Sequence, residues 1–234
     1  MKQKIEKWQH EIERVRNAVT RLLDYRRWNR VYEGIVAANP LLRPGVPVLD
    51  YFRNIYGDYA VMAIRRQCRQ QRDSVSLLGL LKDLEQNAAF ITRAWTRDLY
   101  RQPTPGGTVY PEHFAYELAD GTFKTFADPT GEILDAAIVR ADIERLETAT
   151  KGIFSHSDRV VAHDDPRGPE FDVNFDDLNV AIDTIEEVAK RYILLLTGAS
   201  MRTMTPIDST NAISVFSFPW INPEIRPNFG TETD

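Results

Sequence analysis

Two histidines and an arginine lie close together near residue 160, at a spacing that would place them on one face of a helix. His156, Arg159 and His163 are three and four residues apart, and such side chains are neighbours on a helix surface. Metal-independent RNA cleavage needs a base for the 2′-hydroxyl, an acid for the leaving oxygen and a cation for the phosphorane. Imidazole serves either proton role near neutral pH, and guanidinium is a bidentate phosphate ligand. The three residues are therefore candidates for catalysis.

A structural interpretation of these residues stays open. An imidazolium at the end of a helix stabilises its free carbonyl groups, so His163 can be a cap, with Arg159 paired to Asp158 or Asp164. A metal site is disfavoured, because two histidines seven residues apart on a helix are separated by roughly 10 Å, too far for one ion. We expect no metal and no other cofactor.

A second candidate site is a run of four arginines within eight residues. The run consists of Arg65, Arg66, Arg69 and Arg72. On a helix the first, third and fourth of these share a face that can hold phosphate, RNA or an acidic partner. The alternative is a solvated face that pairs with Asp73 and Glu85, or with the acidic residues of segment 144–147. The cluster Arg26, Arg27 and Arg30 is open to the same two interpretations.

Composition and missing motifs exclude several classes of function. The chain contains neither a GxxxxGK[ST] phosphate loop nor a GxGxxG motif after a strand, which are the most common nucleotide-binding motifs. Its single cysteine, Cys68, rules out a disulfide within one chain and disfavours a zinc site built on thiolates. A net charge of −5 argues against broad coating of nucleic acid, although it permits one short phosphate-binding patch.

Charge and hydropathy also set expectations for the compartment. The first residues carry charges every few positions, so we expect no signal peptide. The apolar run 192–196 is far shorter than the roughly 18 residues of a membrane helix. We therefore expect a soluble, cytoplasmic protein with no membrane partner.

The candidate residues must be positioned by secondary-structure elements, and the sequence pattern predicts that these elements are helices. The pattern predicts helices over 3–38, 49–71, a segment starting after Ser76, 91–101, 132–163 and 175–197. The first helix has an apolar stripe at three- and four-residue spacing that blurs at 25–30, where a second short helix is expected to continue to Asn39. The last helix is expected to stop at Gly198. The fold class is therefore mainly α, a bundle of four to five long helices.

Two segments are expected to depart from the bundle. Proline, glycine and Asp-Gly pairs within 102–131 predict an irregular insert, extended over 103–131, with a short strand at 122–126. Residues 199–234 contain four prolines and predict an extended tail, whose apolar segment 213–221 packs on the bundle. The expected organisation is one helical-bundle domain over 1–198, followed by this tail.

Three segments together resemble one protein family. They are Arg65–Leu81 with its arginine run, Asp158–Asp165 with the sequence Val-Ala-His-Asp-Asp, and Phe175–Leu178 with the following helix and the closing Phe216–Trp220. In this order they are similar to the AbiU-type, abortive-infection branch of the HEPN superfamily. The resemblance covers roughly 50–100 and 130–220.

The resemblance implies a HEPN-like bundle that pairs as a homodimer. Many HEPN proteins are ribonucleases that act as toxins or in antiphage defence, often with a cognate antitoxin or regulatory protein. Their motif is an arginine, a polar residue, several spacer residues and a histidine, and two copies form one metal-free cleft. On this chain the motif falls on Arg159 and His163.

The chain departs from that motif in two ways. Only three residues separate Arg159 from His163, where the family has four to six, and Val160 stands at the polar position. Two functions therefore stay open. One is a metal-independent ribonuclease at a homodimer cleft, and the other is a catalytically inactive module that binds RNA, a nucleotide or a protein. A helical interaction protein without a nucleic-acid role is a third alternative.

Overall fold

Four long helices form the body of the protein, as the pattern predicts. The computed structural model describes residues 2–39, 47–69, 74–103, 107–156 and 174–206. The long helices are α1 (Lys2–Ala38), α2 (Pro47–Cys68), α6 (Ala136–His156) and α7 (Phe175–Thr197). The shorter ones are α3 (Leu77–Gln86), the 3-10 turn η1 (Ala88–Phe90), α4 (Arg93–Tyr100) and α5 (Glu112–Phe123). No described residue belongs to a strand, so the expected mainly helical fold class is confirmed.

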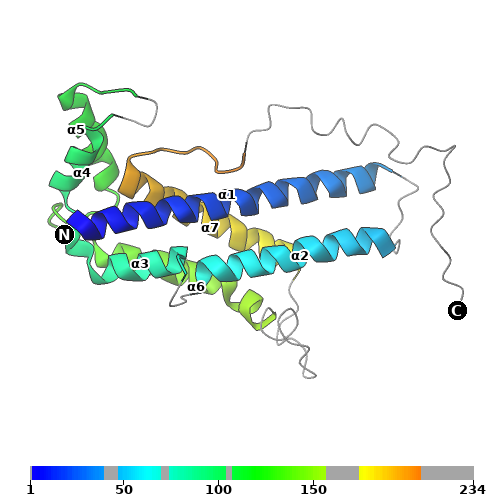
Figure 1. Cartoon of the computed structure of the whole chain (residues 1–234). Coiled ribbons are helices and arrows are strands. Elements are labelled where there is room, and N and C mark those ends of the chain that lie inside the picture. The colour runs from blue at the N-terminus through cyan, green and yellow to red at the C-terminus, as the bar shows by residue number, and fades with distance from the viewer. Residues whose placement is uncertain (1, 40–46, 70–73, 104–106, 157–173, 207–234) are drawn as a thin grey trace, which may run out of the picture.

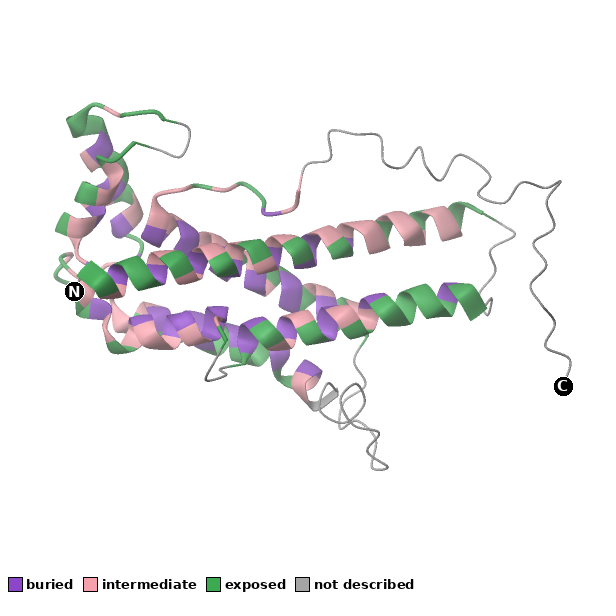
Figure 2. Cartoon of the chain, viewed as in Figure 1, coloured by how far each residue is buried: buried purple, intermediate pink, exposed green. Residues whose placement is uncertain are grey.

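The helices pack as an elongated bundle (Figure 1). Helices α1 and α2 run side by side, and α7 packs against both of them. Helix α6 packs against α3, α7 and α2, while α4 and α5 form a pair at the end that holds the N-terminus. At the opposite end, α1 and α2 extend beyond the start of α7, where Phe175 stacks on Tyr56. In Figure 2 the projecting part of α1 is mostly intermediate in burial, and that of α2 is mostly exposed.

Two apolar stripes form the centre of the core. On α1 the buried stripe is Ile5, Trp8, Ile12, Val15, Val19 and Leu22. On α7 it is Leu178, Ile182, Ile185, Val188, Ala189 and Tyr192. Three- and four-residue spacing puts each set on one helix face, so packing the two faces together removes both from water.

Helix α1 is continuous, whereas the sequence predicts a second short helix from about residue 31. The irregularity in the pattern is Arg26, a charged residue that is buried among the core positions. Its guanidinium pairs with Asp183 and Glu186 of α7, so burial of the charge is compensated and the helix continues. This ion pair also links the second half of α1 to α7.

The ends of the other predicted helices agree to within a few residues. Helix α3 begins after Ser76, whose hydroxyl accepts from the Gly79 amide at 3.1 Å, and α7 ends at Gly198 with φ +69°. Helix α2 ends at Cys68, three residues before the predicted end. Helix α6 begins at Ala136, and its predicted extension over 157–163 lies outside the described residues.

The extended insert predicted for 103–131 is wrong, because α5 occupies much of it. Ala115, Ala119 and Phe123 are buried at four-residue spacing, which stabilises a helix through packing. The Asp120-Gly121 pair, which favours a turn, instead lies within the helix. Both carboxylate oxygens of Asp120 accept from Arg93 and Arg97 of α4, at 2.6–2.9 Å. The predicted strand at 122–126 is also wrong, since it forms the last turn of α5 and the turn after it.

The beginning of the expected tail packs on the bundle. Met204 is buried, and its backbone amide donates to Glu186 of α7 at 2.9 Å. Ala199 and Met201 pack against the same core. Residues 207–234, including the apolar segment 213–221, lie outside the described residues.

Candidate nucleic-acid site

The proposed catalytic residues belong to the connection between α6 and α7. His156 is the last residue of α6, and Arg159 and His163 lie outside the described residues. The connection ends at Asn174, whose side chain accepts from the amides of Asp176 and Asp177 in a capping box. The sequence predicted one helix face for the three candidates, and the structure describes only the backbone of the first of them.

The described end of this connection is held against α2. Phe175, the first residue of α7, stacks on Tyr56 with ring centroids 5.8 Å apart. The guanidinium of Arg53 lies 5.7 Å from the centroid of the Phe175 ring, and it also pairs with Glu33 at 3.0 Å. The pKa of Tyr56 is raised by burial, while the nearby charges of Arg26 and Arg30 oppose the rise. Arg26 and Arg30 of α1 therefore lie near Tyr56, and Arg53 of α2 lies near Phe175 at the start of α7.

A pocket of about 300 Å³ lies beside these cations. Leu23, Arg26, Arg27, Arg30, Val31 and Thr205 line it. Arg26 forms an ion pair with Asp183 of α7. Arg27 pairs with Asp24 at 3.0 Å and lies over the Trp28 ring. Arg30 is exposed and forms no ion pair with any residue that the structure describes. Two of the three arginines therefore have intramolecular roles, as the structural interpretation of this cluster expected.

The run Arg65–Arg72 lies at the C-terminal end of α2, and Arg72 is outside the described residues. Arg66 and Arg69 are exposed and Arg65 is half-buried. Two carboxylates expected as alternative partners pair elsewhere: Glu85 with Arg140 at 2.7 Å and Glu147 with Lys82 at 3.0 Å. Phosphate binding by this run stays a prediction.

The sequence interpretation missed a buried carboxylate cluster between α6 and α7. Asp142, 1% exposed, accepts from Arg191 Nη1 at 2.7 Å and from the Tyr192 hydroxyl at 3.1 Å. Burial, and then the charge of Asp142, raise the pKa of Tyr192. Arg191 also donates to the Thr125 carbonyl and lies over the Phe126 ring, 4.6 Å from its centroid. In the sequence, this cluster is indicated only by Asp142, a charged residue directly before the core residue Ile143.

This cluster is a structural link rather than a reaction centre. The carboxylate of Asp142 is enclosed, and its partners are the guanidinium groups of Arg191 and Arg145 and the Tyr192 phenol, which remain protonated at neutral pH. It fixes α6 against α7 and holds the turn after α5 in place. Among the described residues no three histidine, cysteine or acidic side chains gather as a metal site would require.

Cys68 is expected to resist modification in the folded protein. The thiol is 1% exposed, and burial raises its pKa to about 12. Because the folded state favours the protonated thiol, its contribution to stability is complete below the pKa of the unfolded chain and is lost as pH rises toward 12. A thiol reagent at pH 8 should therefore react only at the rate of unfolding, with rapid reaction in urea as the control. Fast reaction of the native protein would contradict burial of Cys68.

The structure describes a mainly helical bundle, and the connection between α6 and α7 contains Arg159 and His163, whose role stays a prediction. The chain matches the AbiU2 family of HEPN proteins over residues 5–214, and it belongs to that family. It is thus a HEPN-like protein of the abortive-infection type. No curated protein and no solved structure matches the chain. No helix of the described part of the chain is long and apolar enough to cross a membrane.

Proposed function

We propose that this protein is a metal-independent endoribonuclease of the abortive-infection type, with its cleft between two copies of the chain. The observation that carries the proposal is the AbiU2 match, because residues 5–214 include both Arg159 and His163. In this role Arg159 binds the scissile phosphate, and His163 of the two copies supplies the acid and the base. His156, three residues before Arg159 in the sequence, is the further proton-transfer candidate.

The described neighbourhood supports binding of a phosphate chain there. The connection ends beside Arg53 and near Arg30, and α2 carries further exposed arginines toward its C-terminal end. Guanidinium groups along one helix contact successive phosphates, which gives affinity that falls with added salt. We assign RNA binding to Arg65, Arg66, Arg69 and Arg72. A cognate antitoxin or regulatory protein would restrain such an activity in the cell.

Cleavage of total RNA in the presence of a chelator tests this proposal. Wild type is expected to cleave, and His163→Ala is expected to lose activity by about 100-fold or more, since a positioned acid–base group contributes roughly that factor. The matched control is His113→Ala, which removes an exposed histidine of α5 at the other end of the bundle. Equal cleavage by His163→Ala and wild type would overturn the assignment of His163.

The second candidate function is an inactive RNA-binding module. The short spacing between Arg159 and His163, together with Val160 at the polar position, favours it. It predicts that wild type binds RNA at low salt without cleaving it, and that His163→Ala leaves the affinity unchanged. If the affinity for RNA falls steeply with added salt, the contacts are to phosphates, whether or not the RNA is cleaved. Absence of any RNA binding at low salt would favour a protein-interaction role instead.

A further inference from the structure

Helix α2 has an exposed apolar stripe along its projecting half. Val48, Tyr51, Phe52, Ile55 and Met62 are 41–60% exposed. At 100° per residue these positions fall within about 100° of one another, so they form one line along the helix. The green turns of α2 in Figure 2 mark its exposed residues at this end. We refer to these five residues as the α2 stripe.

The α2 stripe is separate from the face that α2 packs into the core. Leu49, Tyr56, Ala60 and Ile64 are buried, and they lie on the opposite side of the helix. Helix α2 is therefore apolar on two faces, and the described residues of the chain cover one of them. A helix that is apolar on both sides is normally buried on both sides, so the second face requires a partner.

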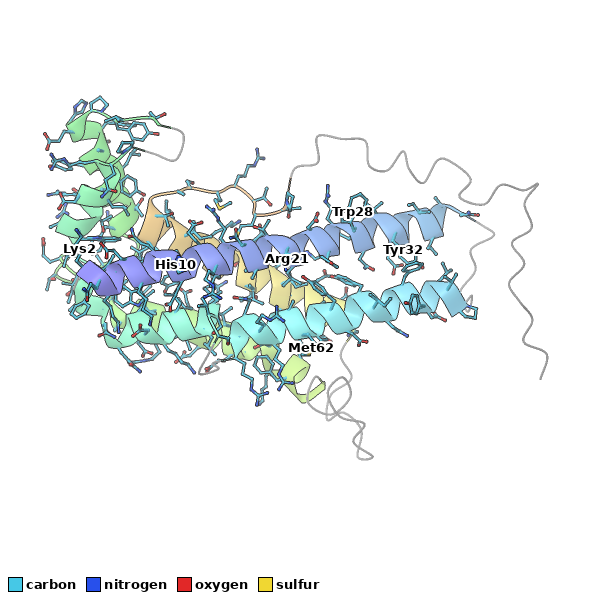
Figure 3. All side chains as sticks on the ribbon, in the orientation of Figure 1. Lys2, His10, Arg21, Trp28, Tyr32 and Met62 are labelled. Carbon is cyan, nitrogen blue, oxygen red and sulfur yellow. The ribbon has the colours of Figure 1, made fainter. Side chains whose placement is uncertain are left out.

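Aromatic residues of α1 widen the stripe into a patch. Tyr25, 47% exposed, stacks on Tyr59 of α2 with centroids 4.1 Å apart. Tyr32 lies on the side of α1 that faces α2, as Figure 3 shows, and its ring contacts Phe52 at 5.6 Å. These contacts hold the side chains in place before any partner binds, which lowers the entropy cost of association.

We infer that the α2 stripe is the surface through which two copies of this chain pair. The inference deepens the homodimer of the proposed function, but it does not require RNA cleavage. Five stripe residues and Tyr25, at roughly 100 Å² each, offer on the order of 600 Å² of apolar surface per copy. A standard interface uses about 800 Å² per partner, so self-association supplies most of what a stable dimer needs.

The charges beside the α2 stripe fit a second copy. Asp58 and Arg66 lie at its edges, and Arg53 is already paired with Glu33. Both signs are present along one helix, so an antiparallel copy does not bring one long row of like charges together. A uniformly basic edge would have favoured nucleic acid, and a uniformly acidic edge would oppose self-association.

Symmetry fixes which residue lies on the two-fold axis. A two-fold contact can pair the α2 stripe with itself in the parallel or the antiparallel direction. We infer the antiparallel pairing, because the parallel one would place Asp58 and Arg66 opposite the same residues of the partner. The midpoint of the stripe, which runs from Val48 to Met62, is Ile55. Ile55 of each copy therefore meets at the axis, and Val48 lies near the partner's Met62.

Engineered cysteines in the full-length protein test this register. Ile55→Cys is expected to form a disulfide-linked dimer under mild oxidation, since only residues with close Cα atoms can be bridged. Val48→Cys and Met62→Cys should link to each other when mixed and much less when alone. Val180→Cys, an exposed position of α7, is the matched control, and the buried Cys68 leaves the background low. Equal linking of Ile55→Cys and Val180→Cys would overturn the inference.

A charge on the axis provides the second test. Ile55→Asp is expected to convert a wild-type dimer into a monomer by mass measurement, with the helical circular dichroism signal unchanged because this side chain lies outside the core. A wild-type monomer, or an Ile55→Asp dimer, would overturn the inference, and residues 213–221 would be the next occupant to test. If Ile55→Cys links but RNA is not cleaved, the pairing surface stands and the ribonuclease falls.

Discussion

Replacement of Asp142 by alanine is expected to lower the free energy of unfolding by about 3 kcal/mol, measured by urea denaturation. The estimate is the lower end of the cost of breaking a buried ion pair, because Arg191 is one-third exposed and can regain part of its hydration. The Tyr192 hydroxyl, in contrast, is enclosed and would lose its acceptor. An unsatisfied buried hydroxyl alone costs about 1–3 kcal/mol.

The control for this prediction separates the buried cluster from general effects of the substitution. Glu144→Ala removes an exposed carboxylate from the same helix and should change stability by less than about 0.5 kcal/mol. Asp142→Asn keeps an acceptor for Tyr192 and should be less harmful than alanine. If Asp142→Ala matches Glu144→Ala in stability, the cluster does not hold α6 against α7.

The long helices could be predicted because a single physical effect determines them. On α1 and α7, burial of one apolar stripe provides most of the stabilisation, and its period is visible in the sequence. Position 26 shows the limit of this reasoning. An arginine within an apolar stripe predicts an interruption of the helix. Carboxylates of α7, Asp183 at 157 residues away among them, compensate the cost of burying the Arg26 charge.

Helix α5 was missed for the opposite reason, since its local pattern is weak and its stabilisation is tertiary. Its three buried residues include two alanines, and Asp120-Gly121 favours a turn when considered locally. Four hydrogen bonds from Arg93 and Arg97 to Asp120 reverse that preference. They also lower the pKa of Asp120, with the Arg93 hydrogen bond as the largest cause. Pairing between separate helices cannot be read from a local window.

The candidate site was predictable only as residue types on a connection. The arginine–histidine spacing and the order of the three family segments predict its place in the chain. The AbiU2 match over 5–214 shows the family, and the role of Arg159 and His163 stays a prediction. The α2 stripe shows what the sequence did not settle. The periodic face of Tyr51, Ile55 and Met62 was evident, but whether it faced the core or the solvent depended on how α2 packs against α1 and α7.

Trp8→Ala is expected to produce the largest loss of stability in this chain, about 3–5 kcal/mol by urea denaturation. Trp8 is fully buried, so its removal combines the lost transfer free energy with an unfilled cavity. The indole nitrogen also donates to Asp83 at 3.0 Å, which ties α1 to α3. Trp28→Ala, which removes a half-buried tryptophan of the same helix, should cost about 1 kcal/mol. Equal losses for the two variants would contradict a core role for Trp8.

The phenylalanine variant separates packing from electrostatics at this position. Burial alone would raise the pKa of Asp83, but hydrogen bonds from Lys4 and Trp8 outweigh it and lower that pKa. The contribution of Asp83 is therefore present above the pKa of the unfolded chain and is lost as pH falls through the lower folded value. Trp8→Phe keeps an aromatic ring but removes one donor, so its stability should fall less steeply than that of wild type below about pH 4. Parallel pH profiles for the two proteins would show that Trp8 acts through packing alone.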